Sequence, residues 1–411
     1  MQTHIVTVTG YGSGMSSEPM QTHIVTVTGY GSGGDGIARL EDGRVVFIRG
    51  AARGDVLEVR LVEEKPRSAK AEITRVMEPS PNRIEPDCPA YPACGGCDFR
   101  HITYEEELAA KLSRVNDALE RIGGLSIRVS EILTTGRTEG YRNKAVLHSD
   151  GTSLGFFRSN SHEVIPVSGC LLLKDDINKA MKNLTPEGEI LLHGGITLRS
   201  GRNGIDGPLE EELDGLVFGI SGFFQVNTAA ASLLYKKARE FAALKKNETL
   251  VDIYCGVGSL TLFVGRDAGY ALGVELDRSA VETARENAKR NNMAHVEFLS
   301  ADAAKWDSDR FHAGSKISAG KIPAGTRPTG KISAGTRPDC IIVDPPRKGL
   351  SPAVIRKLLE TAPARIVYIS CDPATLARDL RKLEGYTPQK ICAVDMFPRT
   401  ANVECCCLLT R

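Results

Sequence analysis

A cysteine stands where an apolar run gives way to a helix-like stretch, in the segment IVYISCDPATLARDL at residues 366–380. The run predicts a buried strand that ends at Ser370, and Asp372-Pro373 predicts the start of a helix. The positive end of such a helix favours the thiolate of Cys371, which is the nucleophilic form. A thiolate can add to C6 of a pyrimidine, after which C5 can accept a methyl group and must lose its proton to a base. The alternative is a packing residue, because free cysteine is often buried.

A carboxylate near the end of the chain is the candidate for that base. The last of the 8 histidines is His312, so none lies close to Cys371 in the sequence. Glu404 lies in MFPRTANVECCCLLTR, where it enters an apolar terminal strand. An acid costs free energy in such a strand unless it is paired or functional, and the alternative is an exposed edge position. The three cysteines after it alternate between the two faces of the strand and are interpreted as packing residues.

Polar groups at the ends of successive apolar runs indicate a nucleoside site. The segment LVDIYCGVGSLTL at 250–262 predicts a strand, a glycine turn and a helix, which lets a ligand approach the backbone. Glu275, Asp302 and Asp344 each end a later strand, and Glu275 is suited to ribose hydroxyls. A structural turn is one alternative. A dinucleotide fold is another, but its third glycine would fall at Thr261. S-adenosylmethionine, which has no pyrophosphate, fits this pattern better.

Four further cysteines have the spacing of a metal site. Cys88, Cys94 and Cys97 form C-x5-C-x2-C, and Cys170 follows in VSGCLLL. Three clustered thiols and a distant fourth suit an iron–sulfur cluster, and zinc is the alternative. A disulfide framework is disfavoured, because the chain is long and its 11 cysteines are an odd number.

The elements that must position these residues fall into three parts. Residues 20–78 alternate apolar and polar side chains between glycine-rich turns, which predicts a small β-barrel. Residues 79–217 are mixed, with a helical pattern at 104–122. From 218 to 411, short apolar runs alternate with helical patterns, which predicts an α/β domain with a parallel sheet.

Two segments interrupt this organisation. Residues 1–14 recur unchanged at 20–33, so residues 1–19 are interpreted as a duplicated, disordered extension. Residues 316–338 are a Gly/Pro/Ser-rich repeat with few bulky apolar side chains, which predicts a disordered low-complexity loop.

Composition limits the partners and the compartment. The net charge of the 411-residue chain is +1, so a nucleic acid would have to meet a local basic patch such as Arg39, Arg44 and Arg49. Those arginines can equally form a solvated face. No leader peptide and no apolar run of membrane-spanning length are evident, which predicts a cytoplasmic protein with reduced cysteines.

Together these motifs resemble the RNA (uracil-5-)-methyltransferases, and most closely the 23S rRNA branch that carries an iron–sulfur cluster. The matching stretches are CPAYPACGGCDFRHITYEEELAAK, FFQVN, DIYCGVG, GVE, DPPRKG, SCDPATLARD and DMFPRTANVE. The resemblance implies an α/β Rossmann-like methyltransferase domain at 218–411, a TRAM-type, OB-like β-barrel at 20–78 and a mixed α+β central domain at 79–217.

The resemblance also implies roles for individual residues. Cys371 would be the nucleophile and Glu404 the proton acceptor. The site for S-adenosyl-L-methionine and the target base would be lined by Gln225, Tyr254, Glu275 and Asp344, and with less family support by Asp302 and Ser259. A [4Fe–4S] cluster would be bound by Cys88, Cys94, Cys97 and Cys170. The chain departs from the family at Arg399 and Asn402, where histidines are usual.

The implied activity is methylation of uridine C5 in RNA, most closely 23S rRNA, by a monomer without a protein partner. The target base would have to leave its stack to expose C5 and C6. The alternatives are a tRNA uridine-C5 methyltransferase, whose branch typically lacks both barrel and cluster, and a catalytically silent RNA-binding protein. The presence of both Cys371 and Glu404 argues against a silent protein.

Overall fold

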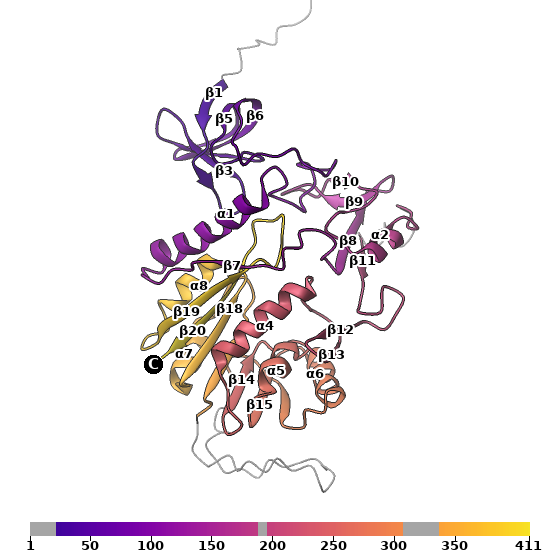
Figure 1. Ribbon diagram of the computed structural model, residues 1–411, viewed down its shortest axis with the longest axis vertical. Helices are drawn as coiled ribbons and strands as arrows, with labels where there is room; N and C mark the ends of the chain where they lie inside the picture. The colour runs from indigo at the N-terminus through magenta and orange to yellow at the C-terminus, as the bar shows by residue number, and fades with distance from the viewer. Residues whose placement is uncertain (1–21, 188–194, 307–336) are drawn as a thin grey trace, which may run out of the picture. The chain divides into compact units, whose positions relative to one another are not determined.

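The computed structural model describes residues 22–187, 195–306 and 337–411 (Figure 1). Two compact units are present: Met1–Gly29 with Asp35–Pro81, and Tyr30–Gly34 with Asn82–Arg411. The predicted extension at 1–19, and the predicted loop at 316–338 save its last two residues, lie outside the described residues.

The first unit is built on a curved six-stranded sheet in the order β1-β5-β6-β4-β3-β2. Its strands are β1 (Thr22–Thr26), β2 (Gly29–Tyr30), β3 (Gly36–Arg39), β4 (Val45–Ile48), β5 (Val56–Lys65) and β6 (Ser68–Glu78). Alternate side chains such as Val25, Val46, Leu57 and Val59 are buried in one core, as the period-two pattern predicts. The all-β prediction for this segment is confirmed.

The second unit contains an eight-stranded sheet in the order β16-β15-β14-β17-β18-β20-β19-β7. Its strands are β7 (Ile132–Leu133), β14 (Thr249–Ile253), β15 (Tyr270–Glu275), β16 (Val296–Ser300), β17 (Cys340–Val343), β18 (Arg365–Ser370), β19 (Thr387–Val394) and β20 (Glu404–Thr410). The first five strands in this order are parallel. Of these, β14 and β17 are buried along their whole length, because helices cover both faces of the sheet.

The end of the sheet differs from the predicted parallel arrangement. β20 runs antiparallel to β18 on one side and to β19 on the other. Residues 395–403 join β19 to β20 in a short connection, which suits antiparallel neighbours, whereas a parallel pair needs a crossover. The sheet is therefore mixed.

Helices pack on both faces of this sheet and give two separate cores. One face carries α4 (Thr228–Ala242), α5 (Ser259–Gly265) and α6 (Arg278–Arg290). The other carries α1 (Tyr104–Asp117), the π-helical turn η1 (Ala118–Ile122), α7 (Pro352–Thr361) and α8 (Pro373–Leu380). Side chains of Asn227, Asp277, Ser351 and Asp372 cap helix starts by accepting backbone N–H groups, as their residue types predict.

The region before the large sheet is mixed α+β, as predicted. A four-stranded sheet has the order β10-β9-β8-β11, and β12 and β13 form a separate hairpin. The elements are β8 (Lys144–Ser149), β9 (Leu154–Phe157), β10 (Val164–Pro166), β11 (Ile196–Arg199), β12 (Glu210–Leu213), β13 (Leu216–Gly219) and α2 (Asp175–Met181). In the described part of the chain, no helix combines the length and the apolar character needed to cross a bilayer.

A buried ion cluster joins α1 to the connection between β19 and β20. Lys111 Nζ lies 2.7 Å from Glu107 Oε1 and 2.6 Å from Asp395 Oδ1, and it donates to the Phe397 carbonyl at 3.1 Å. The side chains of Lys111, Glu107 and Asp395 are all 0% exposed. Tyr104 Oη donates to Asp395 Oδ2 at 2.6 Å. The cluster thus fixes the segment that precedes Glu404.

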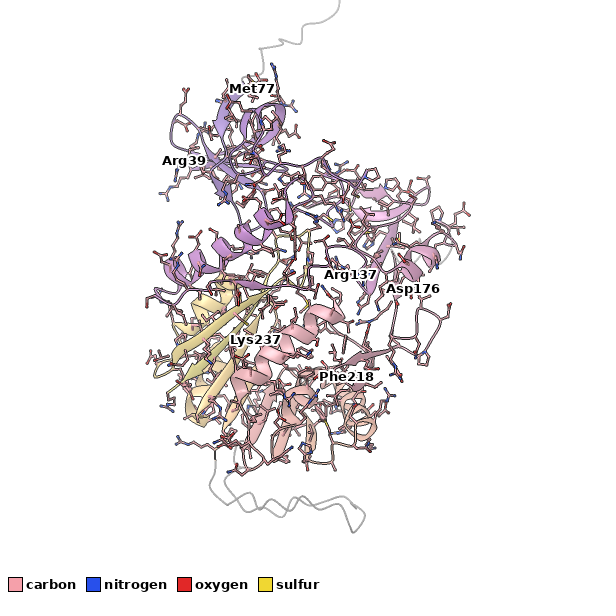
Figure 2. The ribbon with its side chains drawn as sticks, viewed as in Figure 1. Arg39, Met77, Arg137, Asp176, Phe218 and Lys237 are labelled. Carbon is pink, nitrogen blue, oxygen red and sulfur yellow. The ribbon has the colours of Figure 1, made fainter. Side chains whose placement is uncertain are left out.

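Replacement of Lys111 by Met should destabilise the protein strongly, because two buried carboxyl groups lose the cation between them. Breaking a buried ion pair in this way costs about 3–5 kcal/mol. Urea unfolding followed by circular dichroism measures the change. The control is Lys237→Met on α4 (Figure 2), whose half-exposed pair with Glu240 is worth at most about 1 kcal/mol. Equal losses in the two variants would contradict the structural role of the cluster.

Candidate active site

The carboxyl edge of the parallel strands collects the polar residues that sequence analysis selected. Glu275 ends β15, Tyr254 follows β14, Asp344 follows β17 and Cys371 follows β18. Parallel neighbours end at the same edge of a sheet, which is where open α/β sheets bind ligands. The topology therefore brings together residues that are up to 117 positions apart in the chain.

Cys371 and Glu404 lie beside each other because of the register between β18 and β20. The last paired residues of these antiparallel strands are Ser370 and Cys405, so the next positions are Cys371 and Glu404. Glu404 is also paired with Val394 on β19 and is only 4% exposed, whereas Cys371 is half-buried. The alternative of an exposed edge residue at 404 is wrong.

Burial sets the proton affinities of this pair. Burial, followed by the neighbouring Glu404 carboxylate, raises the pKa of the Cys371 thiol to about 11. Burial also raises the pKa of Glu404 to about 8, with a further contribution from the Asp344 carboxylate. The Arg347 guanidinium opposes both shifts. A carboxyl with a pKa near neutrality is suited to accept a proton.

Asp344 adds a second buried carboxyl, and its pKa is raised by burial to about 7. Asp252 lies on the same side of the sheet, where Thr261 Oγ1 donates to its Oδ2 at 2.6 Å. Its pKa is raised by burial to about 8. Sequence analysis did not select Asp252, although an acid inside the apolar run LVDIYC was the available signal. Arg347 was overlooked in the same way within DPPRKG.

The turn after β14 leaves room for a ligand at the backbone. Gly256 has φ +52°, and none of the described residues lies within 4 Å of the position where a Cβ would stand. Gly258 has φ +78°, and a Cβ there would lie 2.6 Å from the Phe298 ring. Tyr254 also has a positive φ of +72°, which is uncommon for a bulky residue and marks a constrained site.

A small cavity of about 120 Å³ lies beside this turn and is lined by Tyr254, Glu275 and Asp302, among others. The Glu275 carboxylate accepts three backbone N–H groups, from Gly256 at 3.1 Å, Leu276 at 2.7 Å and Asp277 at 3.0 Å. A carboxylate has about four acceptor positions, so a ligand hydroxyl can still bind. The three bonds hold the group in place for that contact.

Gln225 and Ser259 do not line that cavity. Gln225 is 6% exposed, and its carbonyl accepts from Asn143 Nδ2 at 3.1 Å. Ser259 is 8% exposed, and its hydroxyl lies 2.9 Å from the Tyr235 hydroxyl. Both residues are buried.

The two departures from the family pattern have separate contacts. Arg399 has φ +68°, and its N–H donates to Glu107 Oε1 at 2.7 Å, so this residue belongs to the buried ion cluster. Asn402 Oδ1 accepts from Arg347 Nη2 at 3.4 Å. Asn402 therefore contacts the cation that acts on both Cys371 and Glu404.

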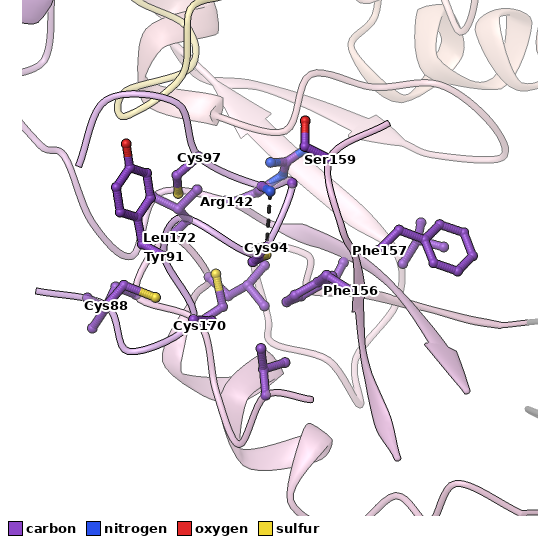
Figure 3. A pocket seen from close by; sticks show the side chains of 18 of the residues that line it. Cys88, Tyr91, Cys94, Cys97, Arg142, Phe156, Phe157, Ser159, Cys170 and Leu172 are labelled. Atoms are coloured by element: carbon purple, nitrogen blue, oxygen red, sulfur yellow. Dashed lines mark hydrogen bonds between the residues drawn. The ribbon is translucent and has the colours of Figure 1, made fainter. Parts of the chain in front are cut away.

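The four spaced cysteines line one cavity of about 660 Å³, shown in Figure 3. The Gly96 N–H and Arg100 Nε each lie 3.4 Å from a sulfur, that of Cys94 and that of Cys97 respectively. Burial raises the pKa of Cys97 to about 12. None of the 11 cysteines forms a disulfide. Over residues 22–187, 195–306 and 337–411, no group of three His, Cys, Asp or Glu side chains is close enough to hold a single metal ion.

The fold is that of a Rossmann-like methyltransferase. A tRNA (uracil-54, C5)-methyltransferase of Pyrococcus abyssi, solved in complex with S-adenosyl-L-homocysteine, aligns with a TM-score of 0.70 at 22% identity. The alignment covers 94% of this chain and 100% of that one. At this level of identity the likeness shows the fold alone.

Sequence comparison gives the family. Residues 218–411 match the tRNA (Uracil-5-)-methyltransferase family model, and residues 17–74 match the TRAM domain. Proteins named uncharacterized RNA methyltransferases are 31% identical in Clostridium tetani and 32% identical in Gloeobacter violaceus. Each alignment covers 92% of this chain and 94% of the relative. The chain belongs to the RNA (uracil-5-)-methyltransferase family and is a transferase.

Replacement of Glu404 by Gln should stabilise the protein at neutral pH. The pKa of this carboxyl is raised from 4.5 to about 8, so folding favours its protonated form. The cost of burying the group is absent below about pH 4.5, grows as the pH rises and levels off above about pH 8. Gln avoids this cost, so we expect a gain of about 2–3 kcal/mol near pH 7.

Urea unfolding at several pH values checks this expectation. The gain should disappear near pH 4.5, and Glu360→Gln, at an exposed position on α7, should show no comparable trend. A Glu404→Gln variant that is less stable than the wild type at neutral pH would contradict the assigned environment of the carboxyl.

Proposed function

We propose that the protein methylates C5 of uridine in RNA by way of a covalent bond between Cys371 Sγ and C6 of the base. The observation that carries the proposal is the juxtaposition of a thiol and a buried carboxyl at the carboxyl edge of the sheet. The strand register sets Cys371 beside Glu404, and Asp344 lies close enough to raise the pKa of both. Family membership supplies the reaction class.

In the proposed reaction, Cys371 and Glu404 act in separate steps. Cys371 releases its proton to water as Sγ attacks C6, and the electrons that reach C5 make that carbon nucleophilic. Bound S-adenosyl-L-methionine supplies an electrophilic methyl group to C5. The Glu404 carboxylate then takes the C5 proton, and the electrons of that C–H bond restore the double bond as Sγ leaves C6. Glu404 must therefore be ionised before the last step.

The cofactor proposal rests on the cavity beside the glycine turn. Glu275 keeps an acceptor position for a ribose hydroxyl, and Tyr254 and Asp302 line the same space. Gly256 has no side chain that would block a ligand from approaching the turn. The Pyrococcus abyssi relative is described with S-adenosyl-L-homocysteine. We assign Gln225 and Ser259 to the enclosing wall, and Asp344 to the boundary between cofactor and target base.

The RNA substrate needs a base that has left its stack, because a covalent catalyst cannot reach C6 within a helix. In the TRAM domain, Arg44 is held by Asp42 at 2.6 Å and Glu64 at 2.8 Å, so it is less suited to bind phosphate than sequence analysis expected. Arg39 (Figure 2) donates to the Gly43 carbonyl at 3.0 Å and keeps an exposed position for phosphate. The substrate class we favour is 23S rRNA, on the family resemblance, with tRNA as the alternative.

We further propose that Cys88, Cys94, Cys97 and Cys170 hold a [4Fe–4S] cluster. The residues fit the group, since four thiols surround one cavity and donors from Gly96 and Arg100 lie against two of the sulfurs. Hydrogen bonds and positive charge of this kind stabilise cluster thiolates. The spacing of three clustered thiols and a distant fourth, together with the family resemblance, favours iron–sulfur over zinc. The role is structural, since the thiol and base belong to other elements.

Anaerobically purified protein should be brown and should contain about four irons per chain. Cys170→Ser should lose the iron, because one of the four ligands is gone. Cys392→Ser replaces a half-buried cysteine that lies outside the cavity, and it should keep the iron. Iron and zinc analysis checks the result, and one zinc per chain in colourless protein would overturn the cluster.

Opposite effects of two substitutions should identify the nucleophile and the base. Cys371→Ala should abolish both methyl transfer and any covalent RNA adduct. Glu404→Gln should still permit attack and methylation, but elimination should stall, so a methylated protein–RNA adduct should accumulate. A denaturing gel with radiolabelled methyl groups, run with 23S rRNA and tRNA transcripts in separate reactions, reports both outcomes and the substrate class. Methylation by Cys371→Ala would falsify the mechanism.

A further inference from the structure

We propose that Arg114 is a positioning residue that sets the separation between the nucleophile segment and the base segment. This inference rests on the proposed function, in which Cys371 and Glu404 play those two parts. Arg114 comes from α1 and touches neither of the two side chains. It acts through the residues that adjoin them.

One guanidinium bridges the two segments. Arg114 Nη1 donates to the Ala401 carbonyl at 2.7 Å, and Nη2 donates to Asp372 Oδ2 at 3.2 Å. Asp372 directly follows Cys371, and Ala401 lies three residues before Glu404. The Arg114 side chain is 19% exposed and the Asp372 side chain is 32% exposed, so the bridge is partly shielded from water. The planar guanidinium has fixed donor directions, so the two contacts set one geometry.

The open end of the strand ladder explains why such a bridge is needed. The pairing of β18 with β20 ends at Ser370 and Cys405, so Cys371 lies beyond the last paired residue of β18. Backbone pairing therefore brings Cys371 to the end of the ladder beside Glu404, but no pairing of its own holds Cys371 in place. Arg114 crosses this open end and connects Asp372 to the segment that leads into β20.

Asp372 extends the effect of the bridge to helix α8. Its Oδ1 accepts the Thr375 N–H at 2.8 Å and so caps the helix, while its Oδ2 accepts from Arg114. The Asp372 N–H also donates to Ser370 Oγ at 3.2 Å. The start of α8, two residues after Cys371, is thereby tied to α1.

The buried ion cluster holds helix α1, and with it Arg114, in place. Glu107, Lys111 and Arg114 are spaced by four and three residues, which places them on one face of the helix. Lys111 and Glu107 belong to the fully buried ion cluster that contacts Asp395, Phe397 and Arg399. Lys111 on this face thus contacts the start of the 395–403 segment, and Arg114, one helical turn later, contacts Ala401 near its end.

The experiment uses the full chain with its cluster, 23S rRNA and tRNA transcripts, and single-turnover methyl transfer normalised to active sites. The variants are Arg114→Gln, Arg114→Lys, Asp372→Asn and the double variant Arg114→Gln/Asp372→Asn. Arg121→Gln is the matched control, since Arg121 is 77% exposed and pairs with Asp117 one turn away. Cys371→Ala serves as the reference for the proposed function.

The rate per active site should fall about tenfold to a hundredfold in Arg114→Gln, since misplacement of reacting groups by about 1 Å has effects of this size. KM for RNA and S-adenosyl-L-methionine should change less than about threefold, because substrate contacts remain. The ratio of trapped adduct to released product should rise, because the Glu404 carboxylate is displaced from the C5 proton of the adduct. Arg114→Lys should recover part of the rate, since an ammonium can still reach one of the two partners.

The double variant should be no slower than the slower single variant, because both substitutions break one bridge. If Arg114→Gln unfolds, the positioning role is tested by the single-turnover rates and the ratios of adduct to product in Arg114→Lys and Asp372→Asn. A wild-type rate and adduct ratio in the folded Arg114 variants, with inactive Cys371→Ala, would overturn the positioning role and leave the proposed function intact. An active Cys371→Ala would overturn both.

Discussion

The buried contact between Lys111 and two carboxyl groups is the constraint on which the catalytic geometry depends. An ionic cluster with no exposure is stable only when each member keeps its partners, so its geometry tolerates little change. It connects α1 with Asp395, a residue 284 positions away in the chain. Because the 395–403 segment leads directly into Glu404, the placement of the proposed base depends on this cluster. Apolar packing alone would allow α1 to slide, whereas directional bonds from Lys111 and Tyr104 do not.

The direction of β20 is the second condition for the site. A parallel strand beside β18 would bring its last residue to the carboxyl edge. An antiparallel strand brings its first residue there, and the first residue of β20 is Glu404. The short connection from β19 permits this reversal. In the mixed sheet, Glu404 at the start of β20 therefore lies beside Cys371, which directly follows the end of β18.

Sequence patterns predicted the strands and the edge residues, because these depend on local periodicity and on where apolar runs end. Cys371 and Glu404 were each selected from the sequence, but the register that brings them together is a tertiary feature. Lys111 and Arg114 were not found, since their partners are fixed by the tertiary placement of α1 and not by spacing. Asp252 and Arg347 lay within recognised motifs, but only the structure shows that they share an electrostatic environment with Asp344 and Glu404. The antiparallel end of the sheet was missed because apolar runs reveal strands without revealing their direction.

Burial raises the pKa of both proposed catalytic groups, which favours the role of Glu404 as a base and disfavours the thiolate of Cys371. It brings the pKa of Glu404 to about 8, which suits proton acceptance near neutrality, and it brings the pKa of Cys371 to about 11. Release of the thiol proton to water at pH 7 is therefore unfavourable by roughly 5 kcal/mol. That cost is a modest part of the barrier of about 13–17 kcal/mol that typical turnover numbers imply. In the proposed mechanism, a stable thiolate is therefore not required before the substrate binds. The proton leaves to water as the Sγ–C6 bond forms. The Glu404 carboxylate must then reach the C5 proton of a base that is bonded to Cys371. The separation between the two segments, rather than the resting charge of the thiol, is therefore the quantity that the fold must hold constant.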